Sequence, residues 1–150
     1  MSRRIAVRAV VVHDDKLFCV RHKAYAGMAE RTYWCAPGGG VDEGEELIQA
    51  LEREIIEEVG IKPKVGNLLY IQQYTDQENG REQLEFFFHV TNTSDFLVVD
   101  AQEASHHDIE IEEFDFIGKN DKKKILPKFL LEEDTQAHIN SNSPTKIFNY

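Results

Sequence analysis

The stretch from Gly39 to Ile61 reads GGVDEGEELIQALEREIIEEVGI and carries two stripes of side chains at helical spacing. An α-helix turns by about 100° per residue, so Glu54, Glu57 and Glu58 fall within one arc of about 100°. The apolar side chains of the same segment form a second stripe beside the acidic one, made of Ile48, Leu51, Ile55 and Val59. This pattern predicts a helix that packs on a core and holds its carboxylates at the rim of that core.

Three carboxylates so close together repel one another, by roughly a few tenths of a kcal/mol per pair in water and by more where they are partly buried. A bound divalent cation would relieve that repulsion. Carboxylate oxygens without a thiolate or an imidazole among them suit a hard ion. We therefore expect the helix to bind Mg²⁺ or Mn²⁺ rather than Zn²⁺.

The segment Pro37 to Gly40 precedes the helix and predicts a loop whose backbone can approach a ligand closely. Asp42 is expected to cap the helix, with Glu45 three residues later as in a capping box, and Gly60 to end it. Backbone amides that lead into a helix N-terminus favour phosphate binding. The residues that we expect to bind substrate in this way are Gly38, Gly39 and Gly40.

The order of residue types in this segment resembles a complete Nudix box, the signature of hydrolases that act on nucleoside diphosphates linked to another moiety. The matching positions are Gly39, Glu45, Arg53, Glu54, Ile55, Glu57, Glu58, Gly60 and Ile61. A solvated acidic helix, the simpler interpretation, requires neither the triglycine segment nor an Arg in this register. The resemblance implies an α/β fold, namely the Nudix-type α/β/α sandwich with a mixed β-sheet between helices.

The resemblance also implies metal-assisted hydrolysis of a pyrophosphate bond. One to three Mg²⁺ would bridge the phosphate oxygens and lower the pKa of an attacking water. The metal ligands would be the Gly39 carbonyl, Glu54, Glu57 and Glu58. Arg53 lies four residues before Glu57 and would orient it, and Glu45 would brace the loop against the helix.

Many Nudix enzymes bring a further acid to the metal site from a segment after the box. Glu103 is our choice for that acid, and Glu110 and Glu112 are its rivals. The catalytic base stays open among Glu54, Glu57 and Glu103.

On the substrate side, Arg21 ends a predicted strand that runs from Leu17. In some Nudix triphosphatases a basic residue at the end of this strand touches the nucleotide, whereas a solvated strand end is the simpler interpretation. One of Tyr70, Tyr74 or Phe87 could stack on a nucleobase, and the sequence does not choose among them.

Nudix members that cleave ADP-ribose often carry a proline, and those that cleave dinucleoside polyphosphates a tyrosine, about fifteen to eighteen residues past the box. Here that window is Asp76 to Asn79, which holds neither. A (d)NTP or a related nucleotide is therefore the favoured small-molecule substrate. The alternative function is a non-hydrolytic Nudix-like sensor that binds a nucleotide or nucleotide sugar.

The rest of the chain predicts strands, a hairpin and a last helix. The expected strands are Ile5 to Val12, Leu17 to Arg21, Val65 to Tyr74, Gln83 to Thr91 and Asp108 to Ile117. Asn79-Gly80 marks the hairpin turn, and Pro127 is expected to delay or kink a helix over Asp121 to Glu133. Residues 135–150 are rich in Asn, Ser and Thr and predict a loosely held polar tail after a Nudix domain over residues 1–134, unless Ile147, Phe148 and Tyr150 dock on that domain.

A length of 150 residues suits one domain, and no apolar run approaches the roughly 18 residues that a membrane span needs. A net charge of −10 disfavours binding of a nucleic-acid polymer. Two cysteines, Cys19 and Cys35, indicate a reducing cytoplasm. A homodimer is compatible with the sequence, which does not fix the oligomeric state.

Overall fold

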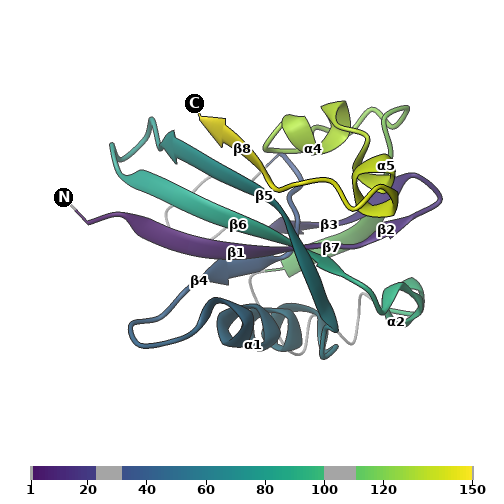
Figure 1. The fold of residues 1–150 in the computed structure, drawn as a ribbon, viewed down its shortest axis with the longest axis horizontal. Helices are drawn as coiled ribbons and strands as arrows, with labels where there is room; N and C mark the ends of the chain where they lie inside the picture. Colours follow the sequence, from purple (N-terminus) through teal and green to yellow (C-terminus); the bar gives the residue numbers. More distant parts are fainter. Residues whose placement is uncertain (1, 23–31, 100–110, 150) are drawn as a thin grey trace.

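A computed structural model describes residues 2–22, 32–99 and 111–149 of the chain (Figure 1). In chain order the elements are β1 (Arg4–Val10), β2 (Val12–His13), β3 (Lys16–His22), β4 (Gly38–Gly40), α1 (Leu47–Val59), β5 (Val65–Thr75), β6 (Glu82–Val90), α2 (Thr93–Leu97), β7 (Ile111–Ile117), α4 (Phe129–Glu132), α5 (Thr135–Asn140) and β8 (Lys146–Asn149). Within these described ranges, no helix is long and apolar enough to cross a membrane.

The strands form two sheets. A five-stranded sheet has the order β4-β1-β6-β5-β8, and a three-stranded sheet has the order β2-β3-β7. The larger sheet is mixed, because β1 runs parallel to β6 while β5 runs antiparallel to it. Helix α1 lies on one side of the strands, and α4 and α5 lie on the other (Figure 1). The predicted α/β class with a mixed β-sheet between helices is confirmed.

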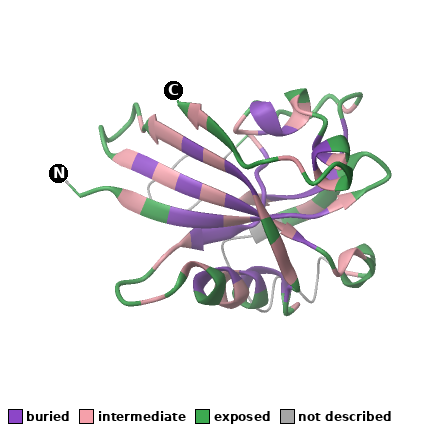
Figure 2. Cartoon of the chain, in the orientation of Figure 1, coloured by how far each residue is buried: buried purple, intermediate pink, exposed green. Residues whose placement is uncertain are grey.

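Strand β1 is mostly buried from Ala6 to Val10 (Figure 2), and its side chains contribute to two clusters of the core. One cluster joins Val7 and Ala9 to the apolar face of α1, and the other joins Val10 to Tyr70 and Phe129. Trp34 and Cys35 are both buried and belong to these clusters. A near-continuous apolar strand is expected where both faces of a sheet are covered.

The prediction of a loop over Pro37 to Gly40 is wrong at the three glycines. Gly38–Gly40 form strand β4, which pairs antiparallel with β1. Gly38 has φ 147, and a Cβ on it would collide with the carbonyl oxygen of Val7. At Gly38, therefore, only a residue without a side chain can bring β4 so close to β1.

Helix α1 begins later than predicted. Its N-cap is Glu46, which forms a capping box with Gln49, so the expected Asp42 cap is wrong. Asp42 instead begins a tight turn, where its N–H donates to Glu45 at 3.0 Å. Gly60 ends the helix with φ 78, as predicted.

The hairpin of β5 and β6 turns at Gly80, which has φ 68, so the Asn-Gly signal is confirmed. The expected helix over Asp121 to Glu133 is short, since α4 begins only at Phe129, after Pro127. A proline removes a backbone donor, so its place before the helix is the one that the backbone tolerates best.

Residues 135–149 do not form the loosely held tail that the sequence predicts. Thr135 accepts or donates a hydrogen bond with the Tyr70 hydroxyl at 2.9 Å. Strand β8 runs parallel to β5, and Phe148 stacks on Phe129 with a centroid distance of 4.0 Å. A few apolar side chains in a polar segment are enough to dock it.

Candidate active site

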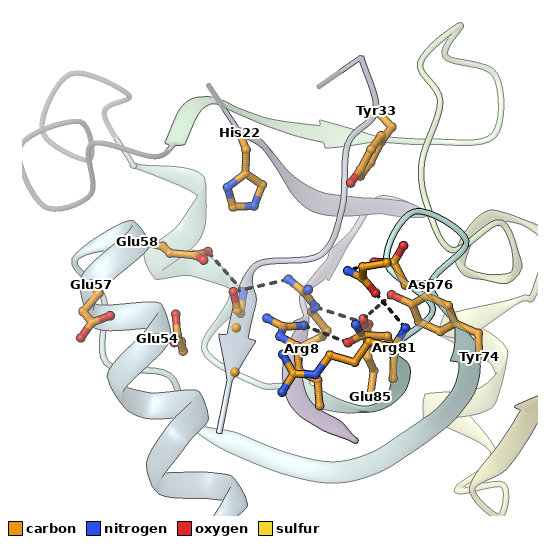
Figure 3. Close-up of a pocket in the computed structure, with 16 residues that line it drawn as sticks. Arg8, His22, Tyr33, Glu54, Glu57, Glu58, Tyr74, Asp76, Arg81 and Glu85 are labelled. Atoms are coloured by element: carbon orange, nitrogen blue, oxygen red, sulfur yellow. Dashed lines mark hydrogen bonds and ion pairs between the residues drawn. The ribbon is translucent and has the colours of Figure 1, made fainter. Parts of the chain in front are cut away.

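A cavity of about 770 Å³ opens between α1, β4 and the β5–β6 hairpin (Figure 3). It brings together side chains that are distant in the sequence. The described residues that line it are Arg4, Arg8, His22, Tyr33, Gly38, Gly39, Gly40, Glu54, Glu57, Glu58, Tyr74, Asp76, Asn79, Arg81, Gln83 and Glu85.

Glu58 is the most deeply placed of the three helix carboxylates. The residue is only 3% exposed, and its carboxylate accepts a hydrogen bond from the Gly38 backbone N–H at 3.2 Å. The prediction that all three carboxylates lie at the rim of the core is wrong for Glu58. On the helical wheel Glu58 lies between Ala50 and Leu51, which are both buried, because β4 packs against this side of α1.

Glu54 lies against the backbone of Gly39. A Cβ built on Gly39 would be 2.5 Å from the Glu54 carboxyl carbon, so no larger residue fits without moving that carboxylate. Burial raises the pKa of the Glu54 carboxyl, and the hydrogen bond from Arg53 opposes the rise. The site therefore holds Glu54 in a partly desolvated position with one cation beside it.

Arg53 joins the helix to the segment before it. Its Nε and Nη2 donate to the two oxygens of Glu45 at 2.8 and 2.9 Å, and its Nη1 donates to Glu54 at 2.8 Å. Its contact with Glu57 is longer, at 3.5 Å, so Arg53 orients Glu54 more than the Glu57 that we predicted. The Nη2 also donates to the Gly40 carbonyl at 3.0 Å. The predicted bracing role of Glu45 is present as this bidentate pair.

Glu57 is half exposed and faces the same cavity as Glu54 and Glu58. Within the part of the chain that the structure describes, no three carboxylate, imidazole or thiol side chains are close enough together to enclose a metal ion. The donor set nevertheless fits a hard cation, because the three carboxylates and the Gly39 backbone offer oxygen atoms only.

The opposite wall of the cavity holds a polar network that the sequence did not reveal. Arg8 lies 3.5 Å from Glu85 and donates to the carbonyls of Ala36 and Gly38 at 3.3 and 3.4 Å. The Tyr74 hydroxyl donates to Glu85 at 3.2 Å. Burial lowers the pKa of Arg8, but the nearby negative groups, with Glu85 the strongest of them, together outweigh burial and raise the pKa overall.

This network connects the hairpin to the glycine strand, because Arg8 reaches both Glu85 and Gly38. One signal for it was present in the sequence: Arg8 is the only polar residue in the predicted strand from Ile5 to Val12. In β6 the polar residues Gln83 and Glu85 alternate with apolar ones and are buried, which marks a polar ligand face rather than a solvated one.

A family model described as the NUDIX domain matches residues 2–129. The chain belongs to the Nudix family. This match confirms the family that the Nudix box predicted.

Among characterised Nudix relatives, the chain is 29% identical over 107 residues to an ADP-ribose pyrophosphatase of Methanocaldococcus jannaschii, covering 70% of this chain and 62% of that protein. It is 46% identical over 66 residues to diphosphoinositol polyphosphate phosphohydrolase 2 of Rattus norvegicus, covering 44% of this chain and 34% of that protein. In both cases the chain spans less than two thirds of the relative's length.

A solved NUDIX hydrolase from Nitrosomonas europaea has the same fold, with a TM-score of 0.70. Its sequence is 22% identical, and the match covers 96% of this chain and 93% of that one. At this identity the likeness supports the Nudix fold only.

The other residues predicted for the site of this Nudix domain do not all line the cavity. Arg21 pairs with Glu113 at 2.9 Å across β3 and β7 and is not among the cavity-lining residues, whereas its neighbour His22 is. Glu103 and Glu110 lie outside the described residues, and so does the side chain of Glu112. The role of these acids stays a prediction.

Of the three aromatic residues considered for stacking on a base, only Tyr74 lines the cavity. Tyr70 and Phe87 are fully buried in the core cluster on the other side of β1. The segment Asp76 to Asn79, where other Nudix subclasses carry a proline or a tyrosine, also borders the cavity, since Asp76 and Asn79 both line it.

Proposed function

We propose that this Nudix chain is a Mg²⁺-dependent pyrophosphohydrolase, with Mn²⁺ as a substitute, that cleaves a phosphoanhydride bond in a nucleoside diphosphate derivative. The observation that carries the proposal is the packing of β4 against α1. Gly39 lies against the Glu54 carboxylate, and Gly38 donates to Glu58, so two acids are held at fixed places beside an open cavity.

Glu54, Glu57, Glu58 and the Gly39 carbonyl would hold the metal. When bound there, a divalent cation supplies charge for phosphate oxygens and makes a coordinated water more acidic. Like-charge repulsion among the carboxylates supports this role, since it falls when a cation lies between them.

The side chains of the protein would then orient the attacking water and accept its proton. In the reaction a water oxygen bonds to phosphorus as the bond from phosphorus to the bridging oxygen breaks, and two phosphate products leave. The proton lost by the water goes to a carboxylate, for which Glu54, Glu57 and Glu103 are the candidates. Arg53 supports Glu54 in this role, because its hydrogen bond fixes the position of the carboxylate.

The favoured substrate is a (d)NTP or a related nucleotide. Neither a proline nor a tyrosine occupies the turn window, and Asp76 and Asn79 face the cavity there instead. Gly38, Gly39 and Gly40 line the same cavity, which supports a role for them in contacting the phosphates, while Arg21 would need to turn away from Glu113 to reach them.

The predicted cellular setting and assembly belong to the same proposal. Cys19 and Cys35 are buried thiols, which suits a reducing cytoplasm. A homodimer stays a prediction.

The deciding experiment is a product assay with ³¹P NMR. The purified chain is incubated with (d)NTPs, ADP-ribose, nucleotide sugars and dinucleoside polyphosphates, in Mg²⁺ and in EDTA. We expect Mg²⁺-dependent cleavage at a phosphoanhydride bond and its loss in the Glu57→Gln, Glu58→Gln double variant. Saturable nucleotide binding without any cleavage would instead establish the sensor function, and full activity of the double variant would exclude the assigned site.

A further inference from the structure

The cavity carries its acidic and basic side chains on different walls (Figure 3). The glutamates come from α1, and Figure 3 shows Arg8 and Arg81 on the far side of β4 from them. Arg4 reaches the same wall from β1, because its Nη1 donates to Gln83 at 3.4 Å. Three guanidinium groups therefore face one end of the cavity.

These three cations are not equally compensated. Arg8 has the nearby Glu85 carboxylate and two backbone carbonyls as partners. Arg4 has only the neutral amide of Gln83, and among the described residues no carboxylate lies within ion-pair distance of it. The Arg81 side chain is exposed at the hairpin turn and likewise forms no ion pair with any described residue.

The position of Arg4 is electrostatically unfavourable without a ligand. Its pKa is lowered, first because it is partly buried and next because the positive charge of Arg8 acts on it, and the negative charge of Glu85 offsets only part of this. Its guanidinium lies beside Gly40, 3.7 Å from the place where a Cβ of Gly40 would be. Arg4 is thus a partly desolvated cation at the edge of the glycine strand, where an anion would restore the charge balance.

At this end of the cavity the lining residues suit a phosphate group better than they suit a stacked base. None of the described lining residues is aliphatic, and the aromatic ones are Tyr33, Tyr74 and the imidazole of His22. The Tyr74 hydroxyl already donates to Glu85, so it does not donate to the edge of a base. A guanidinium, in contrast, matches two oxygens of a phosphate with two parallel N–H groups.

We propose that Arg4 and Arg81 form a second phosphate subsite, which binds a phosphate of the substrate other than the two joined by the scissile anhydride. The inference rests on the proposed hydrolase function and narrows its substrate class to compounds with an additional phosphate. That phosphate is either a further member of the same polyphosphate chain or a monoester on the moiety at the far end. With a net charge of −10 on the chain, such local cations are needed to attract an anion at all.

The first test uses inorganic phosphate as the probe and does not depend on turnover. Phosphate is titrated into the protein in EDTA and followed by isothermal calorimetry. We expect saturable binding whose Kd rises at least about tenfold in Arg4→Gln and in Arg81→Gln, equivalent to about 1.4 kcal/mol. Arg81 is exposed, so its variant tests the subsite even if Arg4→Gln weakens the fold.

Arg3→Gln is the matched control, because Arg3 precedes the same strand but pairs with Glu82 outside the cavity. Its Kd for phosphate should stay within about twofold of the wild-type value. Absence of saturable binding, an unchanged Kd in both subsite variants, or an equal loss in Arg3→Gln would overturn the subsite.

The second test compares substrates that differ by one phosphate. A nucleoside triphosphate is paired with its diphosphate, and ADP-ribose with its 2′-phosphate. We expect kcat/KM to favour the more phosphorylated member of one pair by at least about tenfold, and Arg4→Gln to reduce that ratio while Arg3→Gln keeps it. The pair that shows the preference identifies the position of the phosphate. Cleavage without preference in either pair would refute the subsite and leave the hydrolase function standing.

Discussion

The backbone of Gly39 lies directly against the carboxylate of Glu54, and no side chain separates them. The neighbouring Gly38 donates its N–H to Glu58. These two contacts fix the separation between strand β4 and helix α1. The three glycines of β4 therefore have different roles, which substitutions can separate.

Alanine substitutions along β4 should give three different results. Gly38→Ala places a Cβ against a backbone carbonyl at φ 147, so we expect it to destabilise the fold by at least about 3 kcal/mol. Gly39→Ala meets only the end of the Glu54 side chain, which can move, so the fold should survive while Mg²⁺-dependent turnover falls about a hundredfold.

Gly40→Ala is the stability control of this series, because its Cβ would meet nothing closer than 3.7 Å. Urea unfolding and turnover are measured on the same preparations. A folded, fully active Gly39→Ala variant would show that the position of Glu54 against the backbone is unimportant for the reaction.

Glu58 should show separate effects on stability and activity. Glu58→Ala leaves the buried Gly38 N–H without an acceptor, at a cost of about 1 to 3 kcal/mol. Glu58→Gln keeps an oxygen at that place, so it should recover most of this stability and still lose turnover. Urea midpoints without metal, with the exposed Glu57→Gln as reference, check the comparison. Equal destabilisation by Ala and Gln would mean that the charge, and not the hydrogen bond, stabilises the fold.

The pair of Glu45 and Arg53 predicts a specific pH dependence. Hydrogen bonds from the Arg53 guanidinium lower the pKa of Glu45 from 4.5 to about 2. A carboxylate with a lowered pKa in the folded state stabilises the fold above its ordinary pKa, and this contribution is lost as the pH falls towards the folded value. The window is therefore about pH 4.5 to about 2.

Glu45→Gln should accordingly lower the urea midpoint at pH 7, and the difference from the wild type should shrink below about pH 4.5. Glu43→Gln serves as control, because Glu43 is exposed in the same turn and forms no ion pair with any residue that the structure describes. A difference between Glu45→Gln and wild type that stays constant from pH 7 to pH 3 would contradict the assignment.

The Nudix box was readable from the sequence because helical spacing and residue type are local properties. The same local view could not distinguish Glu57 from Glu58, which lie in one arc of the helix. Strand β4 buries one and leaves the other exposed, and β4 is positioned by its pairing with β1. The start of α1 was misplaced because two acidic capping patterns overlap in the sequence, and the second, at Glu46 and Gln49, is the one used.

The polar wall of the cavity was missed for a related reason. Arg8 and Glu85 come from strands that are distant in the chain and become neighbours only when β1 pairs with β6. The parallel register opposes Arg8 to Phe87 and Ala6 to Glu85. No pattern within either strand contains this register, so the sequence alone could mark the two residues as unusual but could not join them.

The C-terminal segment offers a last prediction, at His138 of α5. This side chain is only 6% exposed, and neither ring nitrogen has a hydrogen-bond partner within the described chain. Its ring packs edge-on against Tyr70 with a centroid distance of 5.2 Å. His138→Phe keeps an aromatic ring at that place and removes two unsatisfied polar atoms, so we expect the variant to be more stable by about 1 kcal/mol.

The measurement is the urea midpoint at pH 7, together with hydrogen exchange of the β8 amides, which report whether the segment stays docked. His138→Ala is the comparison, because it removes the polar atoms and the ring contact together. Its loss of stability should isolate the packing contribution of the ring. A Phe variant that is less stable than wild type, with faster exchange in β8, would show that the imidazole nitrogens are satisfied in solution, as by a buried water.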